Sequence, residues 1–281
     1  MIFRAARAAF GAAALTLSLP VQSQNPAVHI RLDQPAQQGS YVLGWVPAGT
    51  VKLTLDGQDI AFAPDGRFAL GFGRDAPPMS GLTAVLREGR AVTLAVPVAP
   101  RQWRIENLTT LPRLPQPSAE FEARRPVELA QIDAARRQMS KIDGWRQRFI
   151  WPAKGRISGV FGSQRIYAGE PGVPHNGVDV AGGAGAPVVA PADGVVVLAA
   201  DSPFTLEGHL VMVDHGMGLS STFLHLSRID VKRGQVVKQG DPIGAIGMTG
   251  RATGPHLHWG LRWREARLDP ASVAGPMSDG Q

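Results

Sequence analysis

The chain of 281 residues contains no cysteine. This absence excludes a disulfide scaffold, a cysteine-ligated zinc or iron–sulfur centre and a thiol nucleophile, so any metal would need histidine and carboxylate ligands. Aromatic residues are also scarce, at 6%, and no apolar run is long enough to span a bilayer. Hydrophobic residues still make up 44%, which is ordinary for a globular protein and argues against a disordered chain.

Glycine and proline, by contrast, are abundant. The chain holds 33 Gly and 23 Pro, about 20% of all residues against roughly 12% on average. Such a composition favours short strands and turns over a helical bundle or coiled coil. The length suggests about two domains, so we expect a mainly β protein with more than one unit.

The N-terminus has the pattern of an export signal. Arg4 and Arg7 precede the apolar stretch 8–19, and Ser23 offers a small residue at a cleavage position. We therefore expect residues 1–23 to be a signal peptide, although an ordinary apolar N-terminal helix is the alternative. Its removal would lower the formal net charge from +6 to +4 and leave an exported protein that does not span the membrane.

Residues 25–105 have the pattern of a small β domain. Apolar and polar residues alternate at 51–55, as expected for a half-buried strand. Asp56 and Asp65 are each followed by glycine, a hairpin turn signal. Several short strands at this spacing predict a β-sandwich-like N-terminal domain without a catalytic constellation.

Residues 106–150 differ in composition from the preceding segment, and we expect them to form a Pro-rich and helical linker. Pro126 suits the first turn of a helix, and Gly144 could end it. Between them, apolar residues recur at spacings of three and four along one expected helix face: Leu129, Ile132, Ala135, Met139 and Ile142.

Residues 151–272 are expected to form a Gly-rich antiparallel β domain, followed by a tail at 273–281. This segment holds 20 of the 33 glycines and six of the seven histidines. The expected strands are 157–161, 188–190, 194–199, 210–214, 220–226, 242–246 and 256–263. Clustered histidines in such a segment suggest a site built on a sheet.

Two motifs carry possible metal ligands. In His175-Asn176-Gly177-Val178-Asp179, glycine argues against a helix, and on a strand His175 and Asp179 would share one face. Imidazole and carboxylate are both zinc ligands, although alone this motif is weak. His256 and His258 would also share a face, where one could bind a metal while the other handles protons.

The other histidines are less informative by themselves. His225 lies in the apolar run 220–226, where a single histidine is usually a satisfied core residue. His209 and His215 flank another expected strand, and we assign both to structure. Tyr167 lies close to the first motif in sequence, which makes it a candidate substrate contact or a surface aromatic.

Taken together, the motifs His-x3-Asp, a later strand histidine and His-x-His resemble the M23 peptidases, the lysostaphin/LytM-type zinc endopeptidases of bacterial cell walls. The segments 159–165, 187–196 and 234–244 resemble the family in the same order. The resemblance covers about 151–272, so it implies a LytM-type peptidase domain there.

The resemblance implies the roles of five residues. His175, Asp179 and His258 would be the ligands of Zn²⁺, and His225 and His256 would be catalytic histidines that do not bind the metal. The implied activity is hydrolysis of peptide cross-links in peptidoglycan, between D-alanine and diaminopimelate, in the periplasm or cell envelope. The basic charge would favour an anionic wall, whereas the scattered arginines argue against a nucleic-acid partner.

An alternative is a non-catalytic or autoinhibited LytM-type regulator that activates a cell-wall amidase. The N-terminal domain or the helix could then cover the groove. No motif position is missing, which favours catalysis. A lipoyl-type carrier domain is a poorer alternative, because the turn 247–250 contains no lysine to modify.

Overall fold

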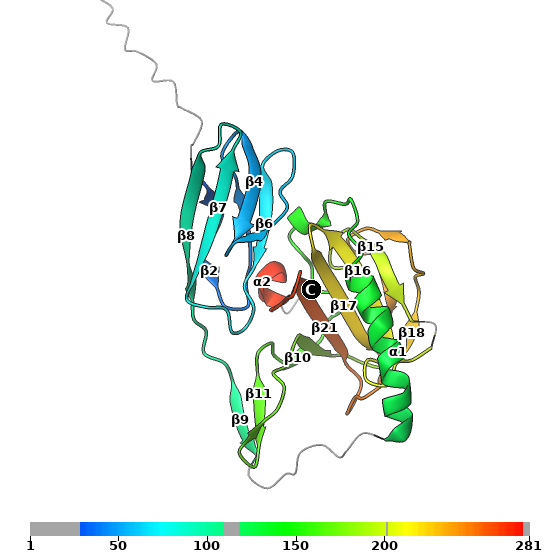
Figure 1. Cartoon of the computed structure of the whole chain (residues 1–281). Helices are drawn as coiled ribbons and strands as arrows, with labels where there is room; N and C mark the ends of the chain where they lie inside the picture. Colours follow the sequence, from blue (N-terminus) through cyan, green and yellow to red (C-terminus); the bar gives the residue numbers. More distant parts are fainter. Residues whose placement is uncertain (1–28, 109–117, 201, 278–281) are drawn as a thin grey trace, which may run out of the picture.

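The computed structural model describes residues 29–108, 118–200 and 202–277 (Figure 1). The expected signal peptide at 1–23 and the prolines at 109–117 lie outside the described residues. The chain is mainly β, as predicted. Within the described ranges, no helix combines the length and the apolar character needed to cross a membrane.

Two sheets form the N-terminal region (Figure 1). Alternate residues of strand β7, Ser80, Leu82, Ala84 and Leu86, are buried, which is the period-two pattern of a sheet with one core face. One sheet has the order β1 (Arg31–Leu32), β3 (Tyr41–Trp45), β6 (Arg67–Gly71). The other has the order β2 (Ala36–Gln37), β8 (Ala91–Ala99), β7 (Met79–Leu86), β4 (Thr50–Leu55), β5 (Gln58–Asp59). The β-rich N-terminal region is thereby confirmed.

An eight-stranded sheet forms the centre of the C-terminal region. Its neighbouring strands pair antiparallel, and each strand expected in 151–272 coincides with a strand here or in a smaller sheet, to within two residues at either end. The order is β10 (Arg156–Gly159), β13 (Val178–Ala181), β21 (Leu257–Trp263), β17 (Leu219–Leu226), β16 (His209–Gly216), β15 (Gly194–Ala199), β19 (Val236–Val237), with β22 (Ala266–Leu268) on β21.

Two smaller sheets flank this centre. One has the order β14 (Pro187–Val189), β20 (Pro242–Ala245), β18 (Arg228–Ile229). The other has the order β12 (Glu170–Pro171), β11 (Gln164–Tyr167), β9 (Ile105–Leu108), and β9 pairs parallel with β11. A segment expected to be linker thus adds a strand to the stretch that leads to His175.

The helix differs from the expectation. Helix α1 runs Ala119–Arg136 with Ser118 as its N-cap, so Pro126 lies inside it rather than in its first turn. Met139 lies beyond the helix and is 68% exposed. Of the expected apolar face, Ile132 and Ala135 are buried, and the third buried helix residue is the acidic Glu128. The short helices are η1 (Gly144–Arg146) and α2 (Ala271–Ala274).

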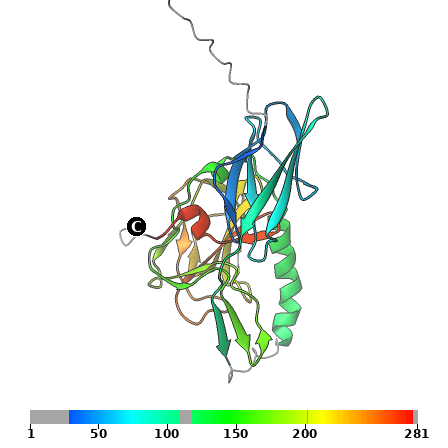
Figure 2. The ribbon, with the colours of Figure 1, turned by 90° about the vertical axis from the view of Figure 1, so that its left-hand side faces the viewer.

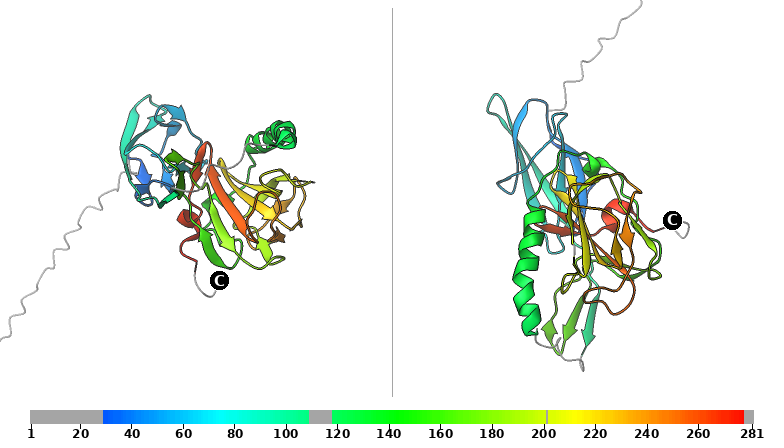
Figure 3. Two further views of the ribbon diagram at one scale, coloured as in Figure 1. Left: turned by 90° about the horizontal axis from the view of Figure 1, so that it is seen from below. Right: turned by 90° about the vertical axis from the view of Figure 1, so that its right-hand side faces the viewer.

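Helix α1 lies along one side of the C-terminal region (Figures 2 and 3). Its buried Ile132 and Ala135 share an apolar cluster with Val197, Leu210 and Met212 of strands β15 and β16. This burial stabilises the helix, because tertiary packing of one face outweighs intrinsic propensity.

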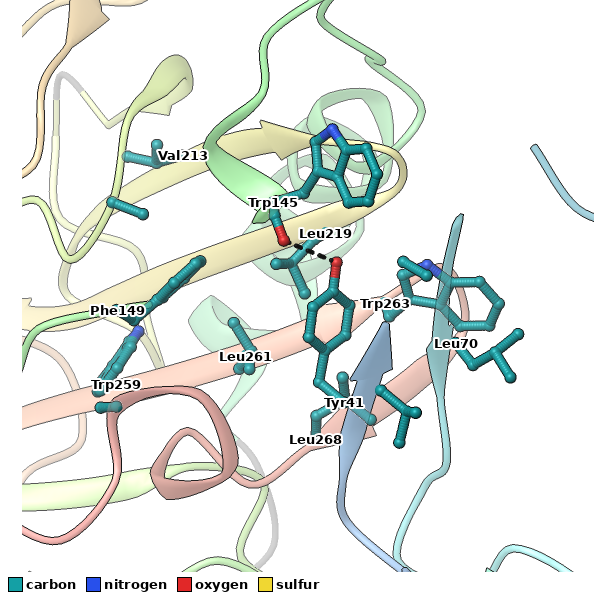
Figure 4. Close-up of a cluster of buried hydrophobic side chains, with 14 of the residues drawn as sticks. Tyr41, Leu70, Trp145, Phe149, Val213, Leu219, Trp259, Leu261, Trp263 and Leu268 are labelled. Atoms are coloured by element: carbon teal, nitrogen blue, oxygen red, sulfur yellow. Dashed lines mark hydrogen bonds between the residues drawn. The ribbon is translucent and has the colours of Figure 1, made fainter. Parts of the chain in front are cut away.

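The N-terminal region and the C-terminal region share one hydrophobic core. In Figure 4, Tyr41 and Leu70 meet Trp145, Trp263 and Leu268, and the Tyr41 hydroxyl donates a hydrogen bond of 3.1 Å to the carbonyl oxygen of Trp145. The approach is close, since a Cβ at residue 71 would lie 2.7 Å from the Cβ of Trp263. Gly71 therefore permits this packing.

Candidate metal centre

Three donor atoms converge beside the central sheet. His175 Nε2 lies 3.1 Å from both Asp179 Oδ1 and His258 Nδ1, and the latter two atoms are 2.9 Å apart. Asp179 on β13 and His258 on β21 are direct register partners, so strand pairing alone brings them together. These three form the only group of this kind that could hold a metal within the described ranges.

His175 reaches the group from an irregular segment and not from a strand. Strand β13 begins at Val178, so the expected shared strand face of His175 and Asp179 is wrong. The backbone of His175 is instead held from both sides, since its N–H donates to Ser163 and its carbonyl oxygen accepts from Gly162. The chain bends at Gly177, so the four-residue spacing between His175 and Asp179 is not spanned by a strand.

Residues of the N-terminal region contact the turn at Gly162, which is hydrogen-bonded to the backbone of His175. The Arg74 guanidinium donates a hydrogen bond of 2.9 Å to the carbonyl oxygen of Gly162 and one of 3.2 Å to Oε1 of Gln164. Trp103 packs edge-on against Phe161 at 5.8 Å between ring centroids. Gly162 has φ +78°, and a Cβ there would overlap the Trp103 ring. The sequence therefore needs glycine at this turn.

The electrostatics of the group favour a bound cation. Burial raises the pKa of Asp179, but hydrogen bonds from His175 and His258 outweigh it and hold this pKa well below its usual range. Burial also lowers the pKa of His258. At His175 burial lowers the pKa, and the Asp179 carboxylate more than compensates, so the net shift is upward. Asp179 thus stays ionised between two imidazoles.

The donor set fits zinc. His175 Nδ1 lies 3.1 Å from the carbonyl oxygen of Val160, and because a carbonyl only accepts, Nδ1 carries the proton. In the neutral ring the lone pair of Nε2 then faces the Asp179 carboxylate, an arrangement that requires a proton or a cation between them. Two imidazole nitrogens and one carboxylate oxygen are ligands typical of catalytic zinc, with further positions left open.

Two more imidazoles adjoin the group. His256 Nε2 lies 3.8 Å from Asp179 Oδ1, and the ring centroids of His225 and His256 are 4.8 Å apart. His256 Nδ1 faces the carbonyl oxygen of Gly254 at 2.8 Å, and His225 Nδ1 faces that of Thr249 at 2.9 Å. Both rings therefore carry the proton on Nδ1, which leaves each Nε2 as a proton acceptor.

His225 has an unusual backbone. Its φ is +64°, and the β16–β17 register shifts at this point, so His225 is the extra residue of a bulge. Its side chain is buried, and burial, with the Thr249 carbonyl opposing, lowers its pKa. A bulge re-aims one side chain, and such features occur next to active sites.

Two other sequence candidates have contacts of their own. His215 is fully buried on β16, with Nδ1 2.8 Å from the carbonyl oxygen of Asp193 and Nε2 2.9 Å from Ser221 Oγ. Tyr167 lies on β11 and its ring lines the space beside Gly172. The contributions of the Val160, Thr249 and Gly254 carbonyls could not be recognised in the sequence, because backbone atoms carry no residue-type signal.

Comparisons with known proteins find similar sequences and structures. Residues 173–270 match the model of Peptidase family M23. A solved structure from Pseudomonas aeruginosa, assigned there to the M23 peptidases, is 30% identical, covers 88% of this chain and 97% of that one, and has a TM-score of 0.64. The chain belongs to peptidase family M23.

Curated relatives match about half of this chain. Peptidoglycan DD-endopeptidase ShyA of Vibrio cholerae is 41% identical over 133 residues, which is 47% of this chain and 30% of ShyA. The cell division protein DipM of Caulobacter vibrioides is 33% identical over 143 residues, which is 51% of this chain and 22% of DipM. The match therefore spans less than a third of these curated relatives.

Proposed function

We propose that this protein is a zinc-dependent endopeptidase that hydrolyses peptide cross-links of peptidoglycan. The observation that carries the proposal is the convergence of His175, Asp179 and His258, with the imidazoles of His225 and His256 beside them. The substrate class is supported by the DD-endopeptidase names of relatives such as ShyA. The bond we propose joins D-alanine to diaminopimelate.

Three atoms would hold the metal: Nε2 of His175, Oδ1 of Asp179 and Nδ1 of His258. When bound, zinc supplies a Lewis acid that polarises a carbonyl and makes water a usable nucleophile at neutral pH. The protein fixes the ligands, since the Val160 carbonyl sets the tautomer of His175 and strand pairing sets Asp179 against His258.

His225 and His256 would move the protons. Each holds its own proton on Nδ1 against a backbone carbonyl, so Nε2 of one ring can accept the proton of the attacking water. The imidazolium formed in this way can then stabilise the oxyanion and donate the same proton to the leaving amine, either directly or after transfer to the other ring. A fixed tautomer avoids reorganisation during the reaction.

We also propose a cellular setting and a division of the chain. Residues 1–23 would direct export to the periplasm or cell envelope, where peptidoglycan lies. Residues 151–272 would form the peptidase unit, preceded by the N-terminal β domain at 25–105 and the linker at 106–150, and followed by the tail at 273–281.

The decisive experiment is digestion of purified sacculi by the zinc-loaded protein, with mass analysis of the released muropeptides. We expect cross-linked dimers to become monomers whose masses locate the bond. His258→Ala should lose the activity, and the matched control His29→Ala should keep it, because His29 is exposed and outside the site. Zinc-loaded wild-type protein that leaves sacculi intact would refute the enzyme proposal and favour the amidase-activator alternative.

A further inference from the structure

The conformation of His225 is set from outside its own strand. Because His225 is a bulge residue with φ +64°, its N–H does not join the ladder to β16. This N–H donates 2.8 Å to the carbonyl oxygen of Glu207. A non-glycine residue at positive φ costs free energy and persists only where its surroundings hold it, so the segment that carries Glu207 helps to place the His225 ring.

Residues 203–208, which we call the strap, pack against helix α1. Arg125 of the helix forms a two-pronged ion pair with Glu207, at 2.6 Å from Nη1 to Oε2 and 2.9 Å from Nη2 to Oε1. Both side chains are largely buried, at 17% and 14% exposure. A bidentate, partly buried pair of this kind fixes orientation as well as distance.

A second acid completes the attachment. Glu128, with a side chain only 6% exposed, accepts 2.8 Å from the N–H and 2.5 Å from the hydroxyl of Thr205. Arg124 adds a bond of 2.7 Å to the carbonyl oxygen of Pro203. Side chains of helix α1 thus contact the strap at Pro203, Thr205 and Glu207. Glu128, although buried in the helix face, binds the strap through Thr205.

The strap also supports the second contact of His225. The carbonyl oxygen of Leu206 accepts 3.0 Å from the N–H of Arg251, and a Cβ at Gly208 would overlap the backbone of Thr249. Thr249 supplies the carbonyl that holds the His225 ring. Both the backbone and the ring of His225 therefore rest on atoms that the strap holds in place.

We propose that Arg125 and Glu207 are positioning residues for hydrolysis, and that docking of helix α1 keeps His225 in its reactive orientation through the strap. This inference rests on the proposed function only where it concerns turnover. The statement about the conformation of His225 does not depend on any activity. Small displacements of a proton-transfer group reduce the rate strongly, because a shift of about 1 Å can cost on the order of a hundredfold.

The test compares Arg125→Ala, Glu207→Ala and the double variant with Arg136→Ala as control. Arg136 lies on the same helix but pairs with Asp133 of that helix. With a soluble cross-linked muropeptide we expect each single variant to lose roughly tenfold to a hundredfold in kcat at unchanged KM and zinc content. The double variant should lose no more than Arg125→Ala, since both single substitutions remove the Arg125–Glu207 pair and only Arg125→Ala also removes the weaker contact of 3.4 Å with Glu128. Arg125→Lys should recover part of the loss.

A second readout needs no turnover. Hydrogen exchange of the His225 amide should become at least about tenfold faster in Arg125→Ala, while the buried amide of Val213 stays unchanged. The proposal would be overturned if Arg125→Ala kept the kcat and the His225 amide exchange rate of the wild-type protein. It would also be overturned if the loss of kcat scaled with a loss of zinc. If even the wild-type protein cleaves no muropeptide, the proposed function fails while the exchange experiment still decides this inference.

Discussion

At the scale of single residues, backbone carbonyls decide what each imidazole can do. Val160, Thr249 and Gly254 each accept from an Nδ1 atom, of His175, His225 and His256 respectively. These rings consequently present Nε2. His258 differs, because its Nδ1 faces Asp179 and His175. Three of the four histidines therefore present Nε2 to the site, and His258 presents Nδ1.

This difference predicts how substitutions separate metal binding from catalysis. Alanine at His175, Asp179 or His258 removes one of three converging donors, so zinc content and activity should fall together. Alanine at His225 or His256 should abolish activity but leave most of the zinc. Metal analysis of the purified variants tests this, and equal zinc loss in all five would contradict the assignment of roles.

His215 predicts a pH dependence of stability. Burial lowers its pKa from 6.5 to about 4, despite the Asp193 carbonyl, so the unfolded chain binds more protons than the folded one between these values. Its contribution is complete above pH 6.5 and falls as the pH drops towards 4. At about 1.36 kcal/mol per pKa unit, the maximal loss is about 3 kcal/mol.

The measurement is the unfolding free energy from urea titrations between pH 4 and 7, in wild-type protein and in His215→Gln. The variant is expected to be less stable at pH 7, since the contacts of His215 with Asp193 and Ser221 change. Its stability should nevertheless vary less with pH. Parallel curves for both proteins would show that His215 is not buried in its neutral form.

At the scale of elements, the turn 160–164 connects the N-terminal region to His175. Gly162→Ala adds a Cβ at φ +78° against the Trp103 ring, so we expect a loss of about 2–4 kcal/mol from strain and overlap, together with weaker zinc binding. The control Gly169→Ala also has positive φ but nothing within 4 Å of its Cβ. It should cost only about 1–2 kcal/mol.

Unfolding titrations and zinc competition with a chelator measure both effects. Equal zinc affinity in the two variants would mean that the turn does not position His175.

The strands and the site residues could be predicted from sequence to different depths. Alternation at 51–55 and the apolar run 220–226 identify strands because burial repeats with the pleat. The donors Asp179 and His258 were recognisable by type and spacing, yet their register pairing depends on contacts 79 residues apart. Neither the bulge at His225 nor the parallel strand β9 has a local sequence signal.

The helix shows why local pattern fails in another way. Met139 and Ile142 continue the three-and-four spacing, but the chain leaves the helix after Arg136, and the N–H of Ser140 binds the Asp214 carboxylate of β16. Tertiary hydrogen bonding therefore overrides periodicity at the C-terminal end. At the other end, the N-cap Ser118 and two glutamates in the first turn stabilise a start before Pro126.

At the scale of the whole molecule, the two regions are joined by polar contacts set into a shared core. Arg101 pairs with Asp269 at 2.8 Å, with side chains 30% and 10% exposed, and Asp269 also donates its N–H to the carbonyl oxygen of Gly39. Tyr41 reaches Trp145 across the same junction (Figure 4). Separation of the regions would expose large aromatic surfaces, so we expect them to unfold as one unit.

Tyr41 reports on this junction. Burial raises its pKa far above the usual value, and the charge of Arg67 lowers it by less, so the phenolate can form only when the junction opens. Its contribution to stability is complete below about pH 10, the usual tyrosine value, and decreases as the pH rises further. The difference in phenolate absorbance between wild-type protein and Tyr41→Phe should therefore stay near zero at pH 10 and appear only with unfolding. A difference signal with an ordinary midpoint near pH 10 would instead show that the junction is open in solution.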